Sequence, residues 1–148
     1  MKSAAFDLGD HCGWASMNDL GNIHSGMEDL KGKATQSLGV RFIQFEELLR
    51  TIFLDKPPKI IYFEEVRRHN GTQAAHIYGG YKAVLVKFCE SHGVEYLGIP
   101  VGTIKKYWTG NGAAKKHEMI TEAVRRGFVV KSEDQVDALA ILHCGMKT

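Results

Sequence analysis

The first third of the chain combines short runs typical of strands with one long helical repeat. Residues 3–7, roughly 12–18 and roughly 22–30 are separated by the turn sequences LGDHCG and NDLGN, which predicts an antiparallel meander of three strands. Over residues 37–53 the apolar positions recur every three or four residues, which predicts a helix with one face on a core. These positions are Leu38, Phe42, Phe45, Leu49 and Ile52.

The remainder of the chain alternates strands with helices. After Pro57 and Pro58, the continuous apolar run in KIIYFEEV suits a strand that is buried on both faces. A helix over roughly 72–92, weakened locally by two glycines, ends at Gly93 and precedes the strand VEYLGIP. The last predicted elements are a short turn or helix over 103–108, a TGNGAA loop, a helix over 115–126 and a final helix from Glu133.

This order of elements predicts a mixed α/β sheet with helices on its faces, in a single domain over residues 1–148. A hydrophobic content of 44% and a charged content of 24% fit an ordinary globular protein. No apolar stretch approaches the ~20 residues that cross a bilayer, and no signal-peptide pattern opens the sequence. Three distant cysteines fit neither a disulfide framework nor a zinc site. We therefore expect a cytoplasmic protein.

The net charge of +2 is small, but the basic residues are grouped. Each group could pair with phosphates or simply be a solvated surface. The groups are Arg67, Arg68 and His69; Lys105 and Lys106; Lys115, Lys116 and His117; and Arg125 and Arg126. Tyr107 and Trp108 follow two of these lysines and could stack on unpaired bases, although most aromatic residues belong to a core.

Acidic residues follow two of the predicted strands. Asp7 ends the first strand, where it either begins a turn or carries a function. Glu64 and Glu65 end the apolar run Ile60–Phe63, so their carboxylates must reach solvent or a partner such as a metal ion. Because successive strand residues point to opposite faces, only one of these two glutamates can join Asp7.

The final helix carries two more acids. Ser132 and Gln135 have the spacing of a capping box, and the helix dipole would favour Glu133 and Asp134 in the first turn without any catalytic role. Asp137 lies beyond that turn, on an apolar stripe that faces the sheet. Asp134 shares this face, so the two aspartates can present their carboxylates to one site.

A cluster of carboxylates without a histidine and cysteine set favours Mg²⁺ or Mn²⁺ over zinc. Two such ions about 4 Å apart would activate water and stabilise the leaving oxygen in a phosphoryl displacement. The predicted chemistry is therefore hydrolysis of a phosphodiester.

The chain resembles the RuvC-like Holliday-junction resolvases of the RNase H-like nuclease superfamily along nearly its whole length. The resemblance rests on FDLGDHCGWA, IIYFEEV, IPVGTIKKYWTGNGAAKKHEMI and DQVDALAIL, in this order. It implies an RNase H-like fold with a mixed five-stranded sheet and helices on both faces. It also implies a divalent-metal-dependent endonuclease that resolves four-way DNA junctions with two Mg²⁺ ions per site, for which Mn²⁺ can substitute.

The resemblance also implies roles for single residues. Asp7, Glu64, Asp134 and Asp137 would be the metal ligands, with Asp7 bridging both ions. Glu64 is preferred to Glu65 because the family's acid stands two residues before a valine. Lys116, with Lys115 as its competitor, would contact the scissile phosphate as a catalytic residue.

Members of this family act as homodimers, and we expect the dimer surface on the helix that contains residues 77–86. The sequence departs from the family just after Glu64, where Arg67, Arg68, His69 and Asn70 form a more basic stretch that we expect to contact DNA. A compact phage-encoded member, acting in the host cytoplasm, fits this departure. The alternatives are a nuclease that prefers flaps and forks, and a noncatalytic protein that binds branched DNA.

A nucleotide phosphotransferase is disfavoured, although DLGDHCGWA is similar to the phosphate hairpin of actin-like ATPases. Such proteins enclose a nucleotide between two domains, and 148 residues are too few for both. The segment TGNGAAKK lacks the glycine-to-lysine spacing of a Walker loop.

Overall fold

Within the described residues, five strands form one mixed sheet in the order β3-β2-β1-β4-β5. The computed structural model describes residues 2–31, 37–53 and 56–148. The strands are β1 (Ser3–Asp7), β2 (His11–Met17), β3 (Ile23–Asp29), β4 (Ile60–Glu65) and β5 (Glu95–Pro100). The first three strands pair antiparallel, whereas β4 pairs parallel with β1 and β5 parallel with β4. The predicted meander and parallel extension are both confirmed.

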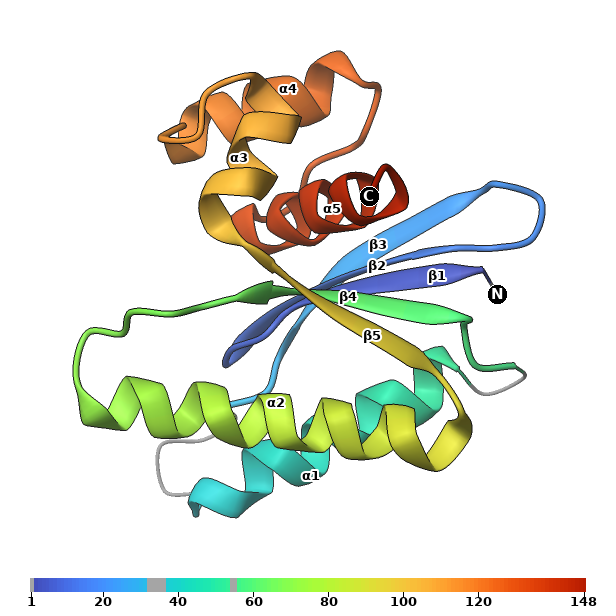
Figure 1. Ribbon diagram of the computed structural model, residues 1–148, viewed down its shortest axis with the longest axis vertical. Helices are drawn as coiled ribbons and strands as arrows, with labels where there is room; N and C mark the ends of the chain where they lie inside the picture. Colours follow the sequence, from blue (N-terminus) through green and yellow to red (C-terminus); the bar gives the residue numbers. More distant parts are fainter. Residues whose placement is uncertain (1, 32–36, 54–55) are drawn as a thin grey trace.

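Helices cover both faces of this sheet (Figure 1). They are α1 (Leu38–Ile52), α2 (Thr72–His92), α3 (Val101–Thr109), α4 (Lys116–Arg125) and α5 (Glu133–Met146). α1 and α2 lie on one face, while α5 lies on the other with α3 and α4 packed against it. Residues 101–109 form a full helix rather than a short turn, because Ile104 and Trp108, one turn apart, are both buried against α5 and α4.

The strands of the sheet centre contribute alternate residues to two hydrophobic cores. Ala5 and Tyr62 belong to the core beneath α5, whereas Phe6 and Phe63 belong to the core beneath α1 and α2. This two-residue period follows from the pleat of a strand. It explains why the apolar run in β4 is continuous, since both of its faces are covered.

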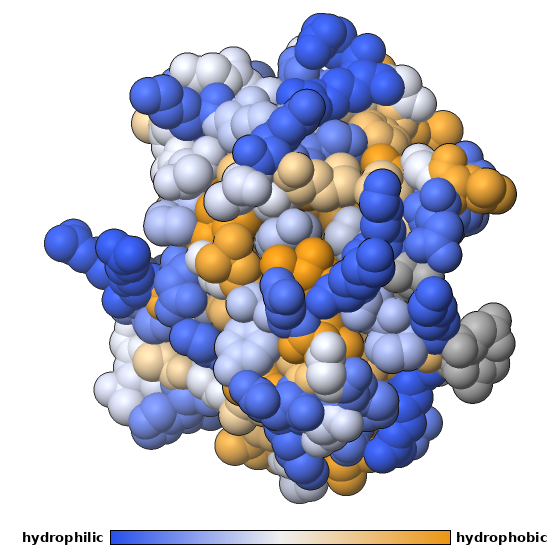
Figure 2. Space-filling view, turned by 45° about the vertical axis from the view of Figure 1, so that its right-hand side comes forward, coloured by the Kyte–Doolittle hydropathy of each residue, from blue (hydrophilic) through white to orange (hydrophobic). Residues whose placement is uncertain are grey.

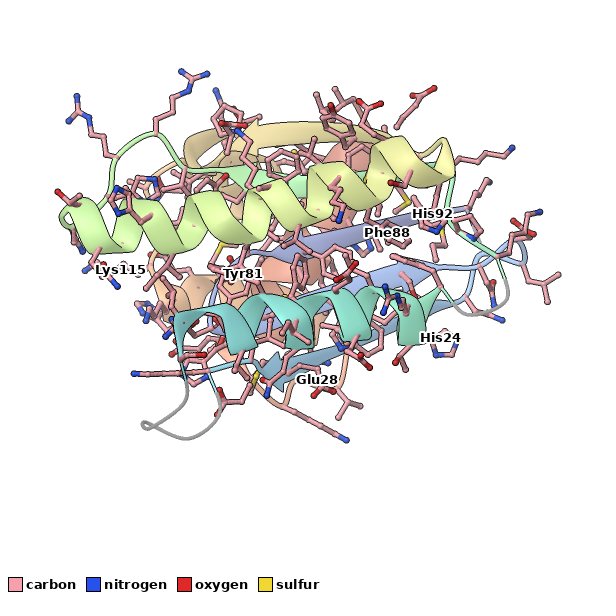
Figure 3. The ribbon with its side chains drawn as sticks, turned by 90° about the horizontal axis from the view of Figure 1, so that it is seen from below. His24, Glu28, Tyr81, Phe88, His92 and Lys115 are labelled. Atoms are coloured by element: carbon pink, nitrogen blue, oxygen red, sulfur yellow. The ribbon has the colours of Figure 1, made fainter. Side chains whose placement is uncertain are left out.

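Aromatic side chains fill the core beneath α1 and α2. Phe45 of α1 meets Phe6 and Tyr81 edge to face, with ring centroids 5.7 and 5.5 Å away. Figure 3 shows Tyr81 reaching from α2 into the space between the two helices. Gly80 lets Phe42 pack directly on the α2 backbone, because a Cβ at Gly80 would collide with the Phe42 ring. The helix continues through both of its glycines.

Hydrophilic side chains cover most of the face shown in Figure 2, with smaller hydrophobic areas between them. Over residues 2–31, 37–53 and 56–148, no helix has both the length and the apolar character needed to span a bilayer.

Candidate active site

Strand alternation brings Asp7 and Glu64 to the same face of the sheet. Asp7 follows Ala5 by two residues and Glu64 follows Tyr62 by two, so both acids point toward the side covered by α5. Glu65 points to the opposite side, where Lys82 of α2 forms an ion pair with it at 3.0 Å. The structure thus places Glu64, not Glu65, on the side of Asp7.

A glycine allows the beginning of α5 to approach Asp7. In the sheet register Gly13 of β2 lies opposite Asp7, and a Cβ on Gly13 would collide with the backbone carbonyl of Asp134. The absence of a side chain at this position therefore lets the α5 backbone lie directly on β2. Ser132 caps the helix by accepting a hydrogen bond from the Gln135 amide at 3.1 Å.

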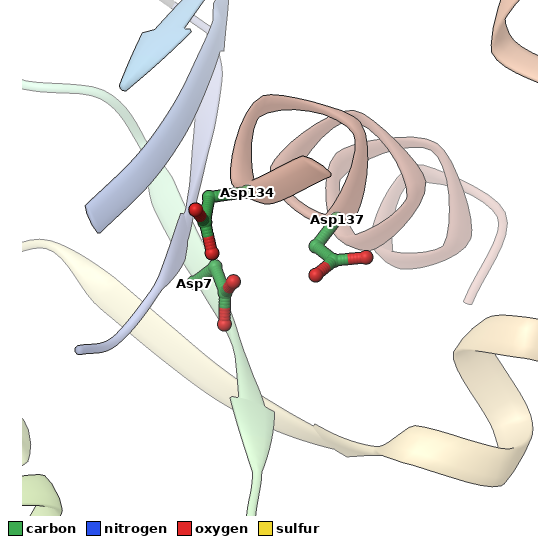
Figure 4. A group of neighbouring side chains, drawn as sticks. All are labelled: Asp7, Asp134 and Asp137. Carbon is green, nitrogen blue, oxygen red and sulfur yellow. The ribbon is translucent and has the colours of Figure 1, made fainter. Parts of the chain in front are cut away.

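Three aspartates meet at this point. Asp7, Asp134 and Asp137 each offer a carboxylate oxygen, and these oxygens all lie within 4.8 Å of one another. Figure 4 shows Asp134, at the start of α5, next to Asp7 of β1, with Asp137 one turn further along the helix. Glu64 stands outside this closest group and lines the adjoining cleft together with Asp137.

The cluster is electrostatically unfavourable when all of its carboxylates are charged. Burial raises the pKa of Asp7 well above its usual value, and the charges of Asp137, Glu64 and Asp134 raise it further. Burial, followed by the charges of Glu64 and Asp134, raises the pKa of Asp137 to about 7. Burial also raises the pKa of Glu64. Each of these carboxyl groups therefore holds its proton more tightly than it would in water.

The donor set fits a hard divalent cation. It consists of carboxylate oxygens, which Mg²⁺ and Mn²⁺ prefer, and among the described residues no histidine or cysteine joins the three-aspartate group. A cation would offset the repulsion that raises these pKa values, since an opposite charge favours the ionised form of a carboxyl group. Asp7, Asp134 and Asp137 could hold such an ion, with Glu64 as a further ligand from β4.

Two lysines line the cleft beside the acids. The cleft has a volume of about 160 Å³, and its wall includes Glu64, Asp137, Lys105 of α3 and Lys116 of α4. Lys105 is close enough that its charge partly offsets the raised pKa of Glu64 and Asp137. Lys116 forms an ion pair with Glu133 at 3.1 Å. The adjacent Lys115 is exposed at the start of α4 and does not line this cleft.

The other predicted DNA-contacting residues differ in their exposure and in their neighbours. Arg67 and Arg68 are exposed and line a groove of about 330 Å³ that begins at Glu64 and ends at the first turn of α3. His69 is half-buried and its ring lies 5.1 Å from that of Tyr78. Lys106 is exposed on α3.

The prediction that Trp108 stacks on bases is wrong. Trp108 is 2% exposed, and its indole N–H donates to the Met119 carbonyl at 2.9 Å. The guanidinium of Arg126 lies 4.0 Å from its ring centroid, so one ring face is covered. Arg126 also donates to Glu122 at 3.0 Å, and Arg125 donates to it at 2.9 Å, so this basic pair is engaged within the protein. Tyr107 is half-buried against the same core.

Two polar connections between elements were not predicted from the sequence. Asp10, which follows β1, accepts hydrogen bonds from Arg41 of α1 at 2.9 Å and from Tyr81 of α2 at 2.7 Å. Gln135 does not close a reciprocal capping box: its side chain accepts from the Lys131 amide and donates to Ser25 of β3 at 2.9 Å. Asp10 lies in a turn sequence, and Gln135 lies at the spacing of a capping box. The local sequence therefore predicted a turn and a helix cap rather than these contacts.

The sheet order and the flanking helices define the RNase H-like fold that RuvC has. The RuvC structure from Thermus thermophilus matches 97% of this chain and 92% of its own, with a TM-score of 0.74 and 20% identity. T. thermophilus RuvC in complex with a Holliday junction substrate matches 96% of this chain and 90% of its own, with a TM-score of 0.80 and 19% identity.

A third similar structure is the yeast mitochondrial Holliday junction resolvase Ydc2. It matches 99% of this chain and 79% of its own, with a TM-score of 0.65 and 16% identity. No protein-family model and no curated protein matches the sequence. The fold is therefore that of the junction resolvases RuvC and Ydc2, at low sequence identity.

Proposed function

We propose that this protein is a divalent-metal-dependent DNA endonuclease that cuts four-way junctions. One observation supports this proposal above all: Asp7 from the first strand and Asp134 and Asp137 from the last helix meet within 4.8 Å, in a chain with the RuvC fold. A purely structural role does not explain three mutually repelling carboxylates in a half-buried position.

Each residue of the site has a proposed task in the hydrolysis. Asp7, Glu64, Asp134 and Asp137 would hold two Mg²⁺ ions, for which Mn²⁺ could substitute. When bound, such ions would supply activation of water and stabilisation of the leaving oxygen. Lys116 reaches the scissile phosphate from α4 by leaving its ion pair with Glu133, and its charge stabilises the phosphate as negative charge develops.

The basic residues around the cleft supply affinity for DNA. Arg67 and Arg68 lie on one side of the acids, and Lys105, Lys106 and Lys115 lie on the α3 and α4 side. His69 and Tyr107 add polar and aromatic contact area to these two sides. Phosphate contacts of this kind bind without base specificity and weaken as salt concentration rises. The junction is favoured over a simple duplex because its duplex arms can contact the arginine side and the α3 and α4 side at the same time.

Cleavage of a synthetic four-way junction in Mg²⁺ or Mn²⁺ tests the proposal. We expect the unmodified protein to nick two strands of like polarity, and Asp7→Asn and Asp137→Asn to reduce nicking at least about a hundredfold. Both variants should bind the junction as tightly as the unmodified protein, because they keep every basic residue. A labelled flap, a fork and a linear duplex serve as matched substrates.

The outcomes separate the candidate functions. Binding without nicking by the unmodified protein would identify a noncatalytic junction-binding protein. Faster cutting of flaps or forks than of four-way junctions would retain the chemistry but reject junction resolution.

A further inference from the structure

The carboxyl end of β4 is held by a hydrogen-bonded tyrosine hydroxyl, which comes from the face of the sheet opposite to α5. The hydroxyl of Tyr78, on α2, donates a hydrogen bond to the Glu64 carbonyl oxygen at 2.8 Å. The backbone N–H of Val66 donates to the same hydroxyl at 3.3 Å. Tyr78 thus binds the backbone on both sides of Glu65.

This contact occurs where β4 extends beyond its pairing with β1. The register between the two strands ends at the Phe6 and Phe63 pair, so β1 has no partner for Glu64. A carbonyl and an amide two residues apart are the pair that one residue of a parallel neighbouring strand would engage. A hydroxyl can donate and accept simultaneously, so Tyr78 can stand in for that residue.

The orientation of Glu64 depends on how this strand end is held. Glu64 must point toward Asp7 and Asp137, and Glu65 must point toward Lys82 on the other side. Rotation of the strand end would move the Glu64 carboxylate away from the aspartates, because neighbouring strand residues face opposite sides. Glu64 lies outside the closest three-aspartate group, so contacts within that group do not fix the position of its carboxylate.

The same tyrosine touches the segment that carries the exposed arginines. The His69 ring lies 5.1 Å from the Tyr78 ring, and Arg67 and Arg68 lie between His69 and the fastened backbone. We propose that Tyr78 is a positioning residue, which fixes the backbone of Glu64 and Val66 so that the Glu64 carboxylate faces the aspartate cluster. This inference rests on the proposed function, and its tests distinguish the two.

The variant Tyr78→Phe removes the hydroxyl and keeps the ring. We expect single-turnover nicking at saturating junction concentration to slow by roughly ten- to a hundredfold, because misplaced catalytic groups are costly. The dissociation constant for the junction in Ca²⁺ should change less than about twofold, since no basic residue is lost. Mn²⁺ affinity, measured by calorimetry without DNA, should fall about tenfold, and the Val66 amide should lose hydrogen-exchange protection.

Tyr81→Phe is the matched control. Tyr81 lies on the same helix, and its hydroxyl donates to Asp10 at 2.7 Å rather than to β4. We expect this variant to lower the melting temperature but to keep both the saturated nicking rate and the Mn²⁺ affinity. Equal slowing by both variants, or unchanged nicking and Mn²⁺ affinity in Tyr78→Phe, would overturn the positioning role.

The proposed nuclease function and the positioning role of Tyr78 can be rejected independently of each other. If the unmodified protein cuts no branched DNA, the nuclease proposal is lost, and the Mn²⁺ affinity and Val66 exchange still decide the role of Tyr78. Reduced Mn²⁺ affinity with a deprotected Val66 amide supports that role, and unchanged values reject it.

Discussion

Asp137 shows how the fold makes one side chain sensitive to pH. The folded protein holds the Asp137 proton up to a pH of about 7, whereas an unfolded chain releases it near its ordinary pKa of 3.8. Between these values the folded state binds more protons than the unfolded state, so the free energy of unfolding must fall as pH rises. The raised pKa of Asp7 and Glu64 acts in the same direction.

Replacing this carboxylate should therefore stabilise the metal-free protein at neutral pH. We expect Asp137→Asn to raise the free energy of unfolding at pH 8 by a few kcal/mol, roughly, and to change it little at pH 4. Urea denaturation in EDTA at both pH values measures the effect. Glu47→Gln, on the exposed side of α1, is the control. A stability loss at pH 8 in Asp137→Asn would show that the carboxylate is a structural partner rather than a strained ligand.

The sequence predicts a residue's role where one local rule decides its position. Asp137 stands on an apolar helix stripe, and Asp7 and Glu64 each follow an apolar strand, so helical and strand periods locate them. No such local rule decides the position of Trp108, because its burial depends on Met119 and Arg126, which belong to α4 and its C-terminal end. Glu64 and Glu65 could not be separated by alternation alone, since the sequence does not reveal which face α5 covers.

At the scale of elements, the neighbouring glycines of α2 have opposite roles. A Cβ at Gly79 would meet no atom within 4 Å, whereas one at Gly80 would collide with the Phe42 ring. We expect Gly79→Ala to stabilise the protein by about 0.5–1 kcal/mol, because alanine favours the helix. Gly80→Ala should destabilise it by about 1–3 kcal/mol, because Phe42 must move.

Thermal unfolding of the two variants checks this pair directly. Each variant is the control for the other, since the residue change and the helix are the same. Stabilisation by both would mean that Phe42 can repack without cost, and destabilisation by both would mean that Gly79 is packed too closely in solution to accept a Cβ.

Local sequence signals predict where the elements begin and end better than they predict which residues of different elements are in contact. The apolar period places the end of α1 within a residue or two, and Gly93 does the same for α2. The helical nature of residues 101–109 is less evident, because only Ile104 and Trp108 mark its buried face. The Gln135 side chain cannot be assigned from spacing, since its partner Ser25 is remote in the sequence.

At the scale of the whole molecule, cutting two strands of one junction requires two sites. We propose a homodimer, and α2 is its expected surface because it presents the small exposed residue Ala83. Sedimentation should give a dimer, and Ala83→Arg should shift it to a monomer. On a cruciform plasmid the monomer should leave nicked circles where the dimer gives linear product.

Val129→Arg is the control for the dimer surface, since Val129 is 77% exposed and lies between α4 and α5. It should leave the protein dimeric. A dimer that persists in Ala83→Arg and still linearises the plasmid would move the interface away from α2.

The topology of the whole sheet was predictable because strand and helix signals alternate in a clear order. Three strands joined by short turns must form a meander, and strands joined by helices must run parallel. The close contact of α5 with β2 was not predictable, because it depends on Gly13, which reads as an ordinary strand glycine.

The contact between Gly13 and Asp134 also sets when the site can exist during synthesis. Asp7 leaves the ribosome early with β1, while Asp134 and Asp137 arrive with the last helix. A nascent chain therefore carries the first strand and Glu64 long before the carboxylates of α5 can join them. The proposed nuclease would remain inert until α5 docks on β2, so incomplete chains would pose no hazard to nearby DNA.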